Sequence, residues 1–234
     1  INGICLKKFY LIKKKIFVLI ITSILIFGNW TVWIYAVATN RIIDASFGYF
    51  IFPIISVLFG YIFLKEKLNK KRIISITLVL LSTLYLLLDF ASLPWIGLTV
   101  AIMWSTYNLL RKKINVETDI GLLIESLIIL PVAIIILYFI IQYNQNDFSM
   151  GSPMLMFLIF IAGPMTVIPL FLYVKGVELS GLGPSGMIFF ITPTGQFLLG
   201  FFYYNEEFSL NKLISFIIIW IAVSVYLKDL YENN

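Results

Sequence analysis

Long apolar runs separated by short polar and basic breaks dominate this chain. A helix needs about 20 mostly apolar residues to cross a bilayer. Eight runs qualify, at residues 16–37, 43–64, 73–90, 94–110, 120–142, 153–174, 183–204 and 211–228. The run at 94–110 is short, but Pro94 is well suited to the first position of a helix. The pattern predicts an all-α membrane protein, a polytopic helical bundle with eight spans.

The distribution of Lys and Arg in the breaks predicts the direction of each span. If the N-terminus lies in the cytoplasm, fifteen of the seventeen Lys and Arg residues fall on the cytoplasmic side, and only Arg41 and Lys212 fall outside. Short cytoplasmic loops of membrane proteins carry such an excess of positive charge. The spans 43–64 and 183–204 would then cross the membrane in opposite directions.

One sequence pattern occurs twice, 140 residues apart. The first copy is Phe50-Ile51-x-Pro53-x₄-Leu58-x-Gly60-x₅-Glu66, and the second is Phe190-Ile191-x-Pro193-x₄-Leu198-x-Gly200-x₅-Glu206. Repeats of opposite topology are a recurrent plan of secondary transporters. We expect a first repeat of three spans at residues 1–92 and a second of five spans at 93–234. This symmetry predicts that two helices precede residue 1; a native eight-span protein is the alternative.

Composition excludes several classes of protein. The chain is 61% hydrophobic and 12% charged, whereas soluble domains carry about 25% charged residues. The net charge of +5 lies in clusters between apolar runs, which indicates membrane topology and not nucleic-acid binding. One cysteine and no histidine leave no intrachain disulfide, no cysteine-based metal site and no His-containing triad. We therefore expect neither an enzyme nor a cofactor.

Glu125 is the most informative polar residue, because it lies about six residues into the run 120–142. An acid at the centre of a spanning helix costs about 2.5–3.5 kcal/mol and usually faces a cavity or a partner. A carboxyl in such a place could accept and release a proton during transport. The alternative is a carboxylate near the membrane interface that is paired with Lys112, Lys113 or a serine hydroxyl.

Two further runs carry polar and aromatic residues at helical spacing. Asn29 and Trp33 share a stripe in the first run, which is typical of a cavity wall; an interfacial aromatic belt is the alternative. The fourth run repeats this pattern with Trp104, Tyr107, Asn108 and Arg111. Of these, Tyr107 and Asn108 could line a pore or form a hydrogen bond between helices. Arg111, at the end of that run, is expected only to anchor the helix at the basic side.

The repeated segments contain further candidates. Thr192 and Gln196 share a face beside a proline, which can free a backbone carbonyl for a ligand or kink the helix. Ser56 and Gly60 form a small-x₃-small pattern that predicts close helix packing. Glu66, like Glu206 in the second copy, lies at a helix end and is expected to be a cap or a loop contact.

Several motifs resemble those of a known family. They are Gly28-Asn29-Trp30, Ala45-Ser46-Phe47-Gly48-Tyr49-Phe50 with Pro53, Leu110-Arg111-Lys112-Lys113, Gly163-Pro164-x-Thr166-x₂-Pro169-Leu170 and Ile219-Trp220-x-Ala222. Together they cover nearly the whole chain and resemble the RarD group of EamA-type carriers, in the drug/metabolite transporter superfamily. Phe52 departs from the family pattern, because relatives often carry Asn before the proline, and Asp44 replaces the usual Glu.

The resemblance implies ten helices in two inverted five-helix repeats, with both termini cytoplasmic, in a bacterial inner (plasma) membrane. It also implies that the solute binds in a central cavity between the repeats. The residues that would lie near this cavity are Asn29, Trp33, Tyr49, Tyr107, Glu125, Thr166 and Gln196.

The expected function is secondary transport of a small organic metabolite or drug by alternating access. The expected partners are a small-molecule substrate and the lipid bilayer, without nucleic acid, and a homodimer is left open. A channel or lipid flippase on the same helices is one alternative, which a linear, non-saturable flux would favour. A membrane scaffold that does not transport is another, and it would tolerate apolar replacement of Glu125.

Overall fold

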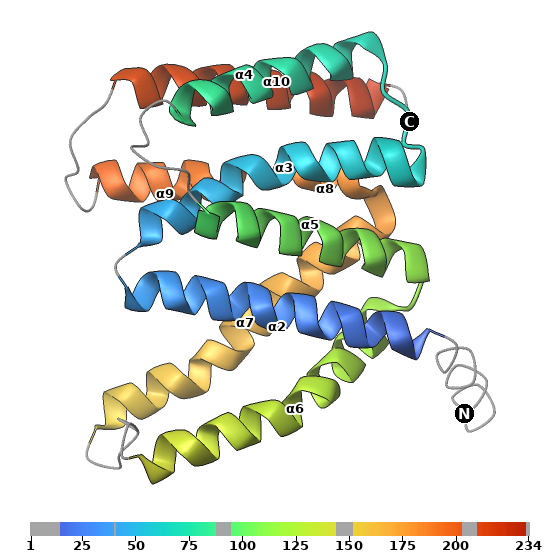
Figure 1. Cartoon of the computed structure of the whole chain (residues 1–234). Helices are drawn as coiled ribbons and strands as arrows, with labels where there is room; N and C mark the ends of the chain where they lie inside the picture. Colours follow the sequence, from blue (N-terminus) through green and yellow to red (C-terminus); the bar gives the residue numbers. More distant parts are fainter. Residues whose placement is uncertain (1–14, 40, 88–94, 144–151, 203–209, 233–234) are drawn as a thin grey trace. The chain divides into compact units, whose positions relative to one another are not determined.

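Every regular element in the described part of the chain is an α-helix (Figure 1). The computed structural model describes residues 15–39, 41–87, 95–143, 152–202 and 210–232. Its helices are α2 (Ile16–Ala38), α3 (Ile42–Leu64), α4 (Lys70–Leu87), α5 (Trp95–Ile114), α6 (Thr118–Gln142), α7 (Pro153–Ser180), α8 (Leu182–Ile188), α9 (Ile191–Phe202) and α10 (Leu210–Glu232). By length and composition alone, α2, α6, α7 and residues 213–232 of α10 can cross a membrane. The predicted all-α, polytopic membrane protein is confirmed.

The helix bounds follow the apolar runs, except that the run 183–204 does not form one helix. It forms α8 and α9, separated by a turn at Phe189 and Phe190. Pro193 explains the break, because proline has no N–H for the carbonyl four residues earlier and its ring collides with that carbonyl. The carbonyl of Phe189 accepts instead from the N–H of Thr192 at 3.0 Å.

The same proline in the first copy of the repeat does not break its helix. Pro53 lies inside α3, which is continuous from residue 42 to residue 64. The segment before Pro193 is a weaker helix, since α8 contains Gly183, Pro184 and Gly186 within seven residues. Glycine and proline have the lowest helix propensities. The cost of the proline is therefore less well offset in the second copy.

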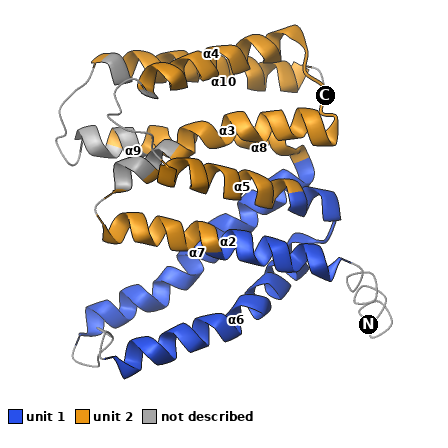
Figure 2. Cartoon of the chain, in the orientation of Figure 1, with its two compact units in different colours: residues 1–27, 110–179 blue, residues 28–109, 180–234 orange. Residues whose placement is uncertain are grey.

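The chain divides into two compact units (Figure 2). Unit 1 consists of residues 1–27 and 110–179, and unit 2 of residues 28–109 and 180–234. Each unit therefore combines segments from both expected repeats. The expected boundary between the repeats, near residue 92, lies outside the described residues, as does Glu206.

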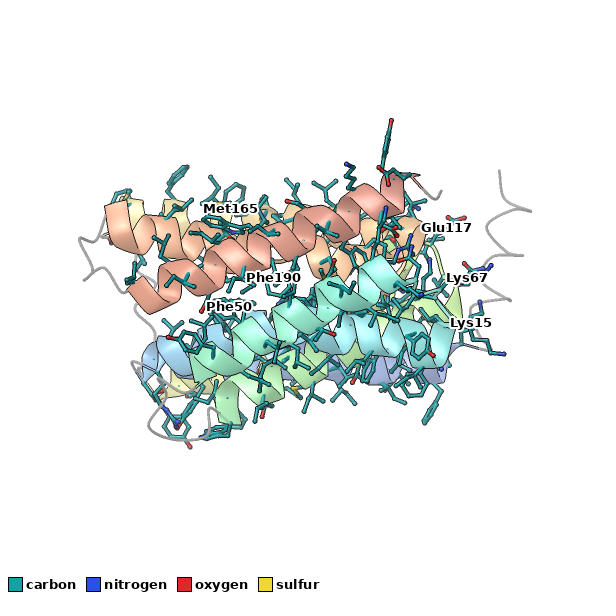
Figure 3. The ribbon with its side chains drawn as sticks, turned by 90° about the horizontal axis from the view of Figure 1, so that it is seen from above. Lys15, Phe50, Lys67, Glu117, Met165 and Phe190 are labelled. Atoms are coloured by element: carbon teal, nitrogen blue, oxygen red, sulfur yellow. The ribbon has the colours of Figure 1, made fainter. Side chains whose placement is uncertain are left out.

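Unit 2 is built on two helix pairs, α4 with α10 and α3 with α8. Figure 3 shows Phe50 and Phe190 near each other, where Phe50 packs against the core between these pairs. The buried side chains of this core are Val57, Val79, Leu86, Met187, Phe190, Ile219, Ala222 and Tyr226. Lipid tails are as apolar as these side chains, so close van der Waals contact must hold the helices together in a membrane.

Small residues let α3 and α8 approach closely. A Cβ on Gly186 would lie 2.7 Å from the Cβ of Ser56. The close packing predicted at Ser56 is therefore confirmed. Gly60, one turn further along α3, has a different role, because a Cβ there would lie 2.5 Å from a carboxylate oxygen of Glu66.

Glu66 joins the end of α3 to the start of α8. Its carboxylate accepts hydrogen bonds from the N–H of Leu182 at 2.8 Å and of Gly183 at 2.9 Å. Gly181 has a φ of 94°, a conformation that favours glycine, and a Cβ there would lie 2.5 Å from the same carboxylate. The prediction that Glu66 is a cap or a loop contact is confirmed.

In unit 1, the start of α2 packs against the turn between α5 and α6. Leu19 shares a buried cluster with Ile114 and Val116. Asn115, in the turn, has a φ of 48°. The ammonium group of Lys15 donates to the carbonyl oxygens of Ile114 and Asn115. These contacts place Thr22, one turn further along α2, inside the unit, where it meets Glu125 of α6.

Candidate functional site

Six aromatic side chains of unit 2 form a continuous series of neighbouring rings, here called the aromatic row. The distances between consecutive ring centroids are 5.2 Å for Trp33–Tyr49, 5.7 Å for Tyr49–Phe189, 4.7 Å for Phe189–Phe52, 6.3 Å for Phe52–Trp104 and 5.3 Å for Trp104–Tyr107. The rings come from α2, α3, α5 and the turn between α8 and α9. All five distances lie in the range of favourable aromatic pairs.

The aromatic row begins at half-buried rings and ends at a fully buried one. Trp33, Tyr49, Phe189 and Trp104 are half-buried, whereas Phe52 and Tyr107 are almost completely buried. Trp104 and Tyr107 are stacked, with 11° between their ring planes. The row thus leads from accessible rings to a closed end, an arrangement on which a planar or apolar solute can stack.

Several buried polar atoms of unit 2 have no hydrogen-bond partner among the described residues. They include the Oδ1 of Asn108 and the hydroxyls of Ser105 and Ser56, as well as those of Ser82 and Thr83 on α4. Asn108 and Ser105 lie on α5, the helix that also carries Trp104 and Tyr107 of the aromatic row. Buried polar groups are nearly always satisfied, and leaving one unsatisfied costs about 1–3 kcal/mol. These atoms can provide polar contacts to a solute.

The remaining candidates in unit 2 take different positions. The amide of Asn29 donates to the carbonyl of Val100 at 2.9 Å, so it ties α2 to α5. Asn108 donates to the carbonyl of Trp104, within its own helix. Gln196 belongs to α9, and its side chain lies outside the described part. Of the predicted cavity residues, the structure brings Trp33, Tyr49 and Tyr107 together in one row.

Glu125 lies in unit 1, and its ion-pair partner is not one of the lysines expected from the sequence. Its carboxylate is 3.6 Å from the Nε of Arg111, and both side chains are 3% exposed. The prediction that Arg111 is only an anchor at the helix end is wrong, because its guanidinium is buried against an acid. The Nζ of Lys112 donates instead to the carbonyl of Glu178. A buried ion pair loses much of its hydration, so removing either partner is costly.

Thr22 completes the site around Glu125. Its hydroxyl lies 2.6 Å from Oε1 of Glu125 and 3.0 Å from the carbonyl of Leu19. A threonine hydroxyl has one proton to donate and can also accept. It can donate to an ionised Glu125, or accept from a protonated Glu125 while donating to Leu19. The site therefore satisfies the carboxyl in both protonation states.

A chain of polar contacts leads from Arg111 to the end of α7. The Nη2 of Arg111 lies 3.4 Å from the carbonyl of Thr118, and the Thr118 hydroxyl donates to Glu178. Glu178 also accepts from Lys175 at 2.8 Å. A Cβ on Gly121 would overlap the guanidinium of Arg111. A glycine at this position of α6 is therefore what makes room for the arginine.

Thr166, the other predicted cavity residue in unit 1, lies exposed on α7. Its hydroxyl donates to the carbonyl of Ala162 at 2.7 Å, one turn earlier in the same helix. The candidates therefore divide between the units. Trp33, Tyr49 and Tyr107 belong to unit 2, and Glu125 and Thr166 belong to unit 1.

Sequence reasoning did not find Phe189 or Thr22 as members of these sites, whereas Trp104 belonged to the stripe expected in the fourth run. Phe189 resembles many other aromatic residues in apolar runs, and hydroxyls in such runs usually bond their own helix. The repeat gave one usable signal, because the proline of its second copy is the residue that breaks the helix at Phe189.

The fold and these sites together define a multi-pass, all-α membrane protein with an aromatic row in one unit and a buried ion pair in the other. The EamA-like transporter family matches residues 4–88 and 93–228. Protein RarD of Salmonella typhi is 36% identical over 216 residues, which cover 92% of this chain and 74% of that protein. Protein RarD of Escherichia coli (strain K12) is 35% identical over 216 residues, 92% of this chain and 73% of that protein.

A third relative is also named a transporter. The uncharacterized transporter YojE of Bacillus subtilis (strain 168) is 35% identical over 208 residues, 89% of this chain and 69% of that protein. The chain belongs to the EamA-like transporter family, as a transporter of the RarD type.

Proposed function

We propose that this protein is a secondary transporter that moves a small organic solute across the bacterial inner membrane by alternating access. The solute has an aromatic or apolar part, which stacks on the aromatic row, and polar groups that meet the unpartnered atoms of Asn108 and Ser105. The observation that carries this proposal is the aromatic row itself, which joins half-buried rings to a closed end.

The expected repeats supply the motion. Residues 1–92 and 93–234 would form inverted halves, with both termini cytoplasmic, and rocking of one half against the other would open the site to each side in turn. Phe189 supports this mechanism, because it contributes to the row from a turn between two helices. Broken helices line the solute sites of many transporters.

Glu125 is proposed to couple transport to a proton gradient. The hydroxyl of Thr22 can hydrogen-bond the carboxyl of Glu125 in both protonation states, and Arg111 would stabilise the ionised form. No bond of the solute is made or broken in this mechanism. The proposed role of the protein is therefore transport and not catalysis.

The test is solute flux into proteoliposomes that contain the purified chain. Chloramphenicol is a suitable first probe, because a Pseudomonas aeruginosa relative, 25% identical over 203 residues, is named chloramphenicol-sensitive protein RarD. A panel of labelled metabolites follows. We expect saturable flux that is stimulated by the same solute on the opposite side, whereas linear, non-saturable flux would indicate a channel.

The aromatic row is tested by Tyr49→Leu, with Phe63→Leu on the same helix as the matched control. Phe63 also has an aromatic neighbour, Phe59 at 5.4 Å, but it is exposed and outside the row. An aromatic contact contributes about 0.5–1.5 kcal/mol, so Tyr49→Leu should raise KM about two- to tenfold. Equal KM values for both variants would remove the row from the solute site.

A further inference from the structure

A cavity of about 1110 Å³ lies in unit 2, away from the aromatic row. It is formed by the end of α3, the segment that leads to α4, the start of α8 and the end of α10. Figure 3 shows Lys67, which lines it, at the opposite end of this unit from Phe50. The lining residues are Tyr61, Ile62, Lys65, Glu66, Lys67, Leu68, Asn69, Arg72, Ser180, Pro184, Tyr226 and Leu230.

The cavity has an excess of positive charge that the described residues do not neutralise. Arg72 is paired with Asp229 at 2.9 Å. By contrast, no described residue provides a hydrogen-bond or ion-pair partner for the ammonium groups of Lys65 and Lys67. Two unpaired cations at the wall of one cavity favour an anionic ligand.

Glu66, the only acid among the described lining residues, does not serve as their counter-ion. Its two carboxylate oxygens accept from the backbone N–H groups of Leu182 and Gly183. These charge-assisted hydrogen bonds fix the carboxylate at the start of α8. The carboxylate of Glu66 is therefore occupied by backbone hydrogen bonds. The ammonium groups of Lys65 and Lys67 remain able to bind an anionic ligand.

Part of the lining of the cavity is apolar and accessible. Tyr61 and Ile62, in the last turn of α3, are 55% and 60% exposed. In a membrane protein, exposed apolar side chains at the end of a spanning helix face acyl chains, and the basic residues that follow lie at the level of the headgroups. The cavity also exceeds the roughly 300–1,000 Å³ of sites for drug-sized ligands, so an inorganic anion alone would not fill it.

We propose that this cavity binds the phosphate-bearing headgroup of an anionic phospholipid. The ammonium groups of Lys65 and Lys67 hold the phosphate, and an acyl chain lies along Tyr61 and Ile62. This site is distinct from the proposed solute site. The lipid-binding proposal also does not depend on the proposed transport function.

The test compares two double variants of the full chain that remove the same charge from the same region. K65Q/K67Q removes the two cations that line the cavity. K70Q/K71Q removes two that follow closely in sequence but do not line it. Retention of phosphatidylglycerol and phosphatidylcholine is measured by native mass spectrometry of the purified protein, and thermal unfolding checks that each variant is folded.

We expect the unaltered protein to retain phosphatidylglycerol in preference to phosphatidylcholine. Each lysine near an anionic headgroup contributes about fivefold in affinity, so K65Q/K67Q should weaken retention more than tenfold while K70Q/K71Q changes it less than twofold. An equal loss in both variants would show general attraction to basic loops and would overturn the proposal.

A second arm separates a lipid from a soluble phosphate. Ile62→Ser should weaken retention of phosphatidylglycerol, because it removes apolar contact with the acyl chain. Glycerol 3-phosphate supplies a glycerol-linked phosphate, more highly charged than that of the lipid, without the acyl chain. Millimolar amounts should not displace the lipid if the chain contributes to binding. If glycerol 3-phosphate displaces the lipid and Ile62→Ser retains as much phosphatidylglycerol as the unaltered protein, the cavity binds a soluble phosphate. That result would overturn the lipid assignment.

Discussion

The ion pair between Arg111 and Glu125 is the main chemical feature at the scale of single residues. Both side chains are almost fully buried, and Thr22 adds a hydrogen bond to the carboxylate. A buried ion pair is weak evidence for stability, because desolvation offsets most of the attraction. Stability alone therefore does not account for the presence of this pair.

Replacing Glu125 by Gln should abolish the dependence of transport on a pH gradient, because an amide cannot exchange a proton. It should also destabilise the protein by about 3–5 kcal/mol, since the charge of Arg111 is left unpaired in a buried place. Flux with and without an imposed gradient measures the first effect, and thermal unfolding of the purified protein measures the second.

Thr22→Val is the companion variant, because it keeps the shape of the side chain and leaves the ion pair intact. We expect it to remain folded and to show a weaker gradient dependence, since the protonated form of Glu125 loses its acceptor. If Glu125→Gln is folded and still responds fully to the gradient, Glu125 does not couple transport to protons.

The sequence identifies Glu125 but not its environment. An acid in an apolar run is conspicuous, so its burial could be predicted. Its partner could not, because Arg111 is one of three adjacent basic residues at a helix end, where an anchor is the usual role. The turn at Asn115 and the space left by Gly121 allow the side chain of Arg111 to pack against α6. Neither residue indicates such a role in the sequence.

At the scale of helices, the apolar runs predicted nearly all bounds, and the difference lies in the turn between α8 and α9. The two copies of the repeat contain the same proline, yet only the second copy breaks. Local helix propensity decides the outcome, because α8 is rich in glycine and α3 is not. A repeat in the sequence therefore predicts the positions of elements better than their continuity.

Replacing Pro193 by Ala should restore the missing N–H and favour one continuous helix through residues 182–202. Phe189 would then leave the turn and lose its contacts with Tyr49 and Phe52. We expect KM for the transported solute to rise severalfold, with little loss of thermal stability. Flux measurements in proteoliposomes check this outcome.

Pro53→Ala is the matched control, since the proline already lies in an unbroken helix. It should change KM less than twofold. If Pro53→Ala impairs transport as much as Pro193→Ala does, the turn at Phe189 has no special part in binding the solute.

At the scale of the whole chain, Glu66 connects segments that are more than a hundred residues apart. It follows α3, in the first expected repeat, and bonds the start of α8, in the second. The sequence repeat marked Glu66 as a cap, but it gave no indication of which helix is capped. That pairing depends on the tertiary fold, which brings Gly60, Gly181 and Gly183 around one carboxylate.

Glu66→Gln should lower the free energy of unfolding by about 1–3 kcal/mol, because one of the two backbone N–H groups loses a charged acceptor and the amide cannot accept both bonds. Glu232→Gln is the control, since Glu232 pairs with Lys71 and Lys228 at the surface. Such surface pairs contribute about 0–1 kcal/mol. Equal shifts in thermal unfolding for the two variants would contradict the role assigned to Glu66.

The packing of three glycines around Glu66 also predicts which substitutions the family can accept at these positions. The carboxylate of Glu66 fills the space that side chains at Gly60, Gly181 and Gly183 would need. These four positions therefore depend on one another, because a Cβ on any of the glycines would collide with the acid. Across orthologues we expect the four to be inherited as a set, with alanine or serine tolerated at Gly60 only in lineages that have first exchanged the glutamate for a shorter residue. Gly183 is restricted further, because a Cβ there would also lie 2.6 Å from the hydroxyl of Tyr226.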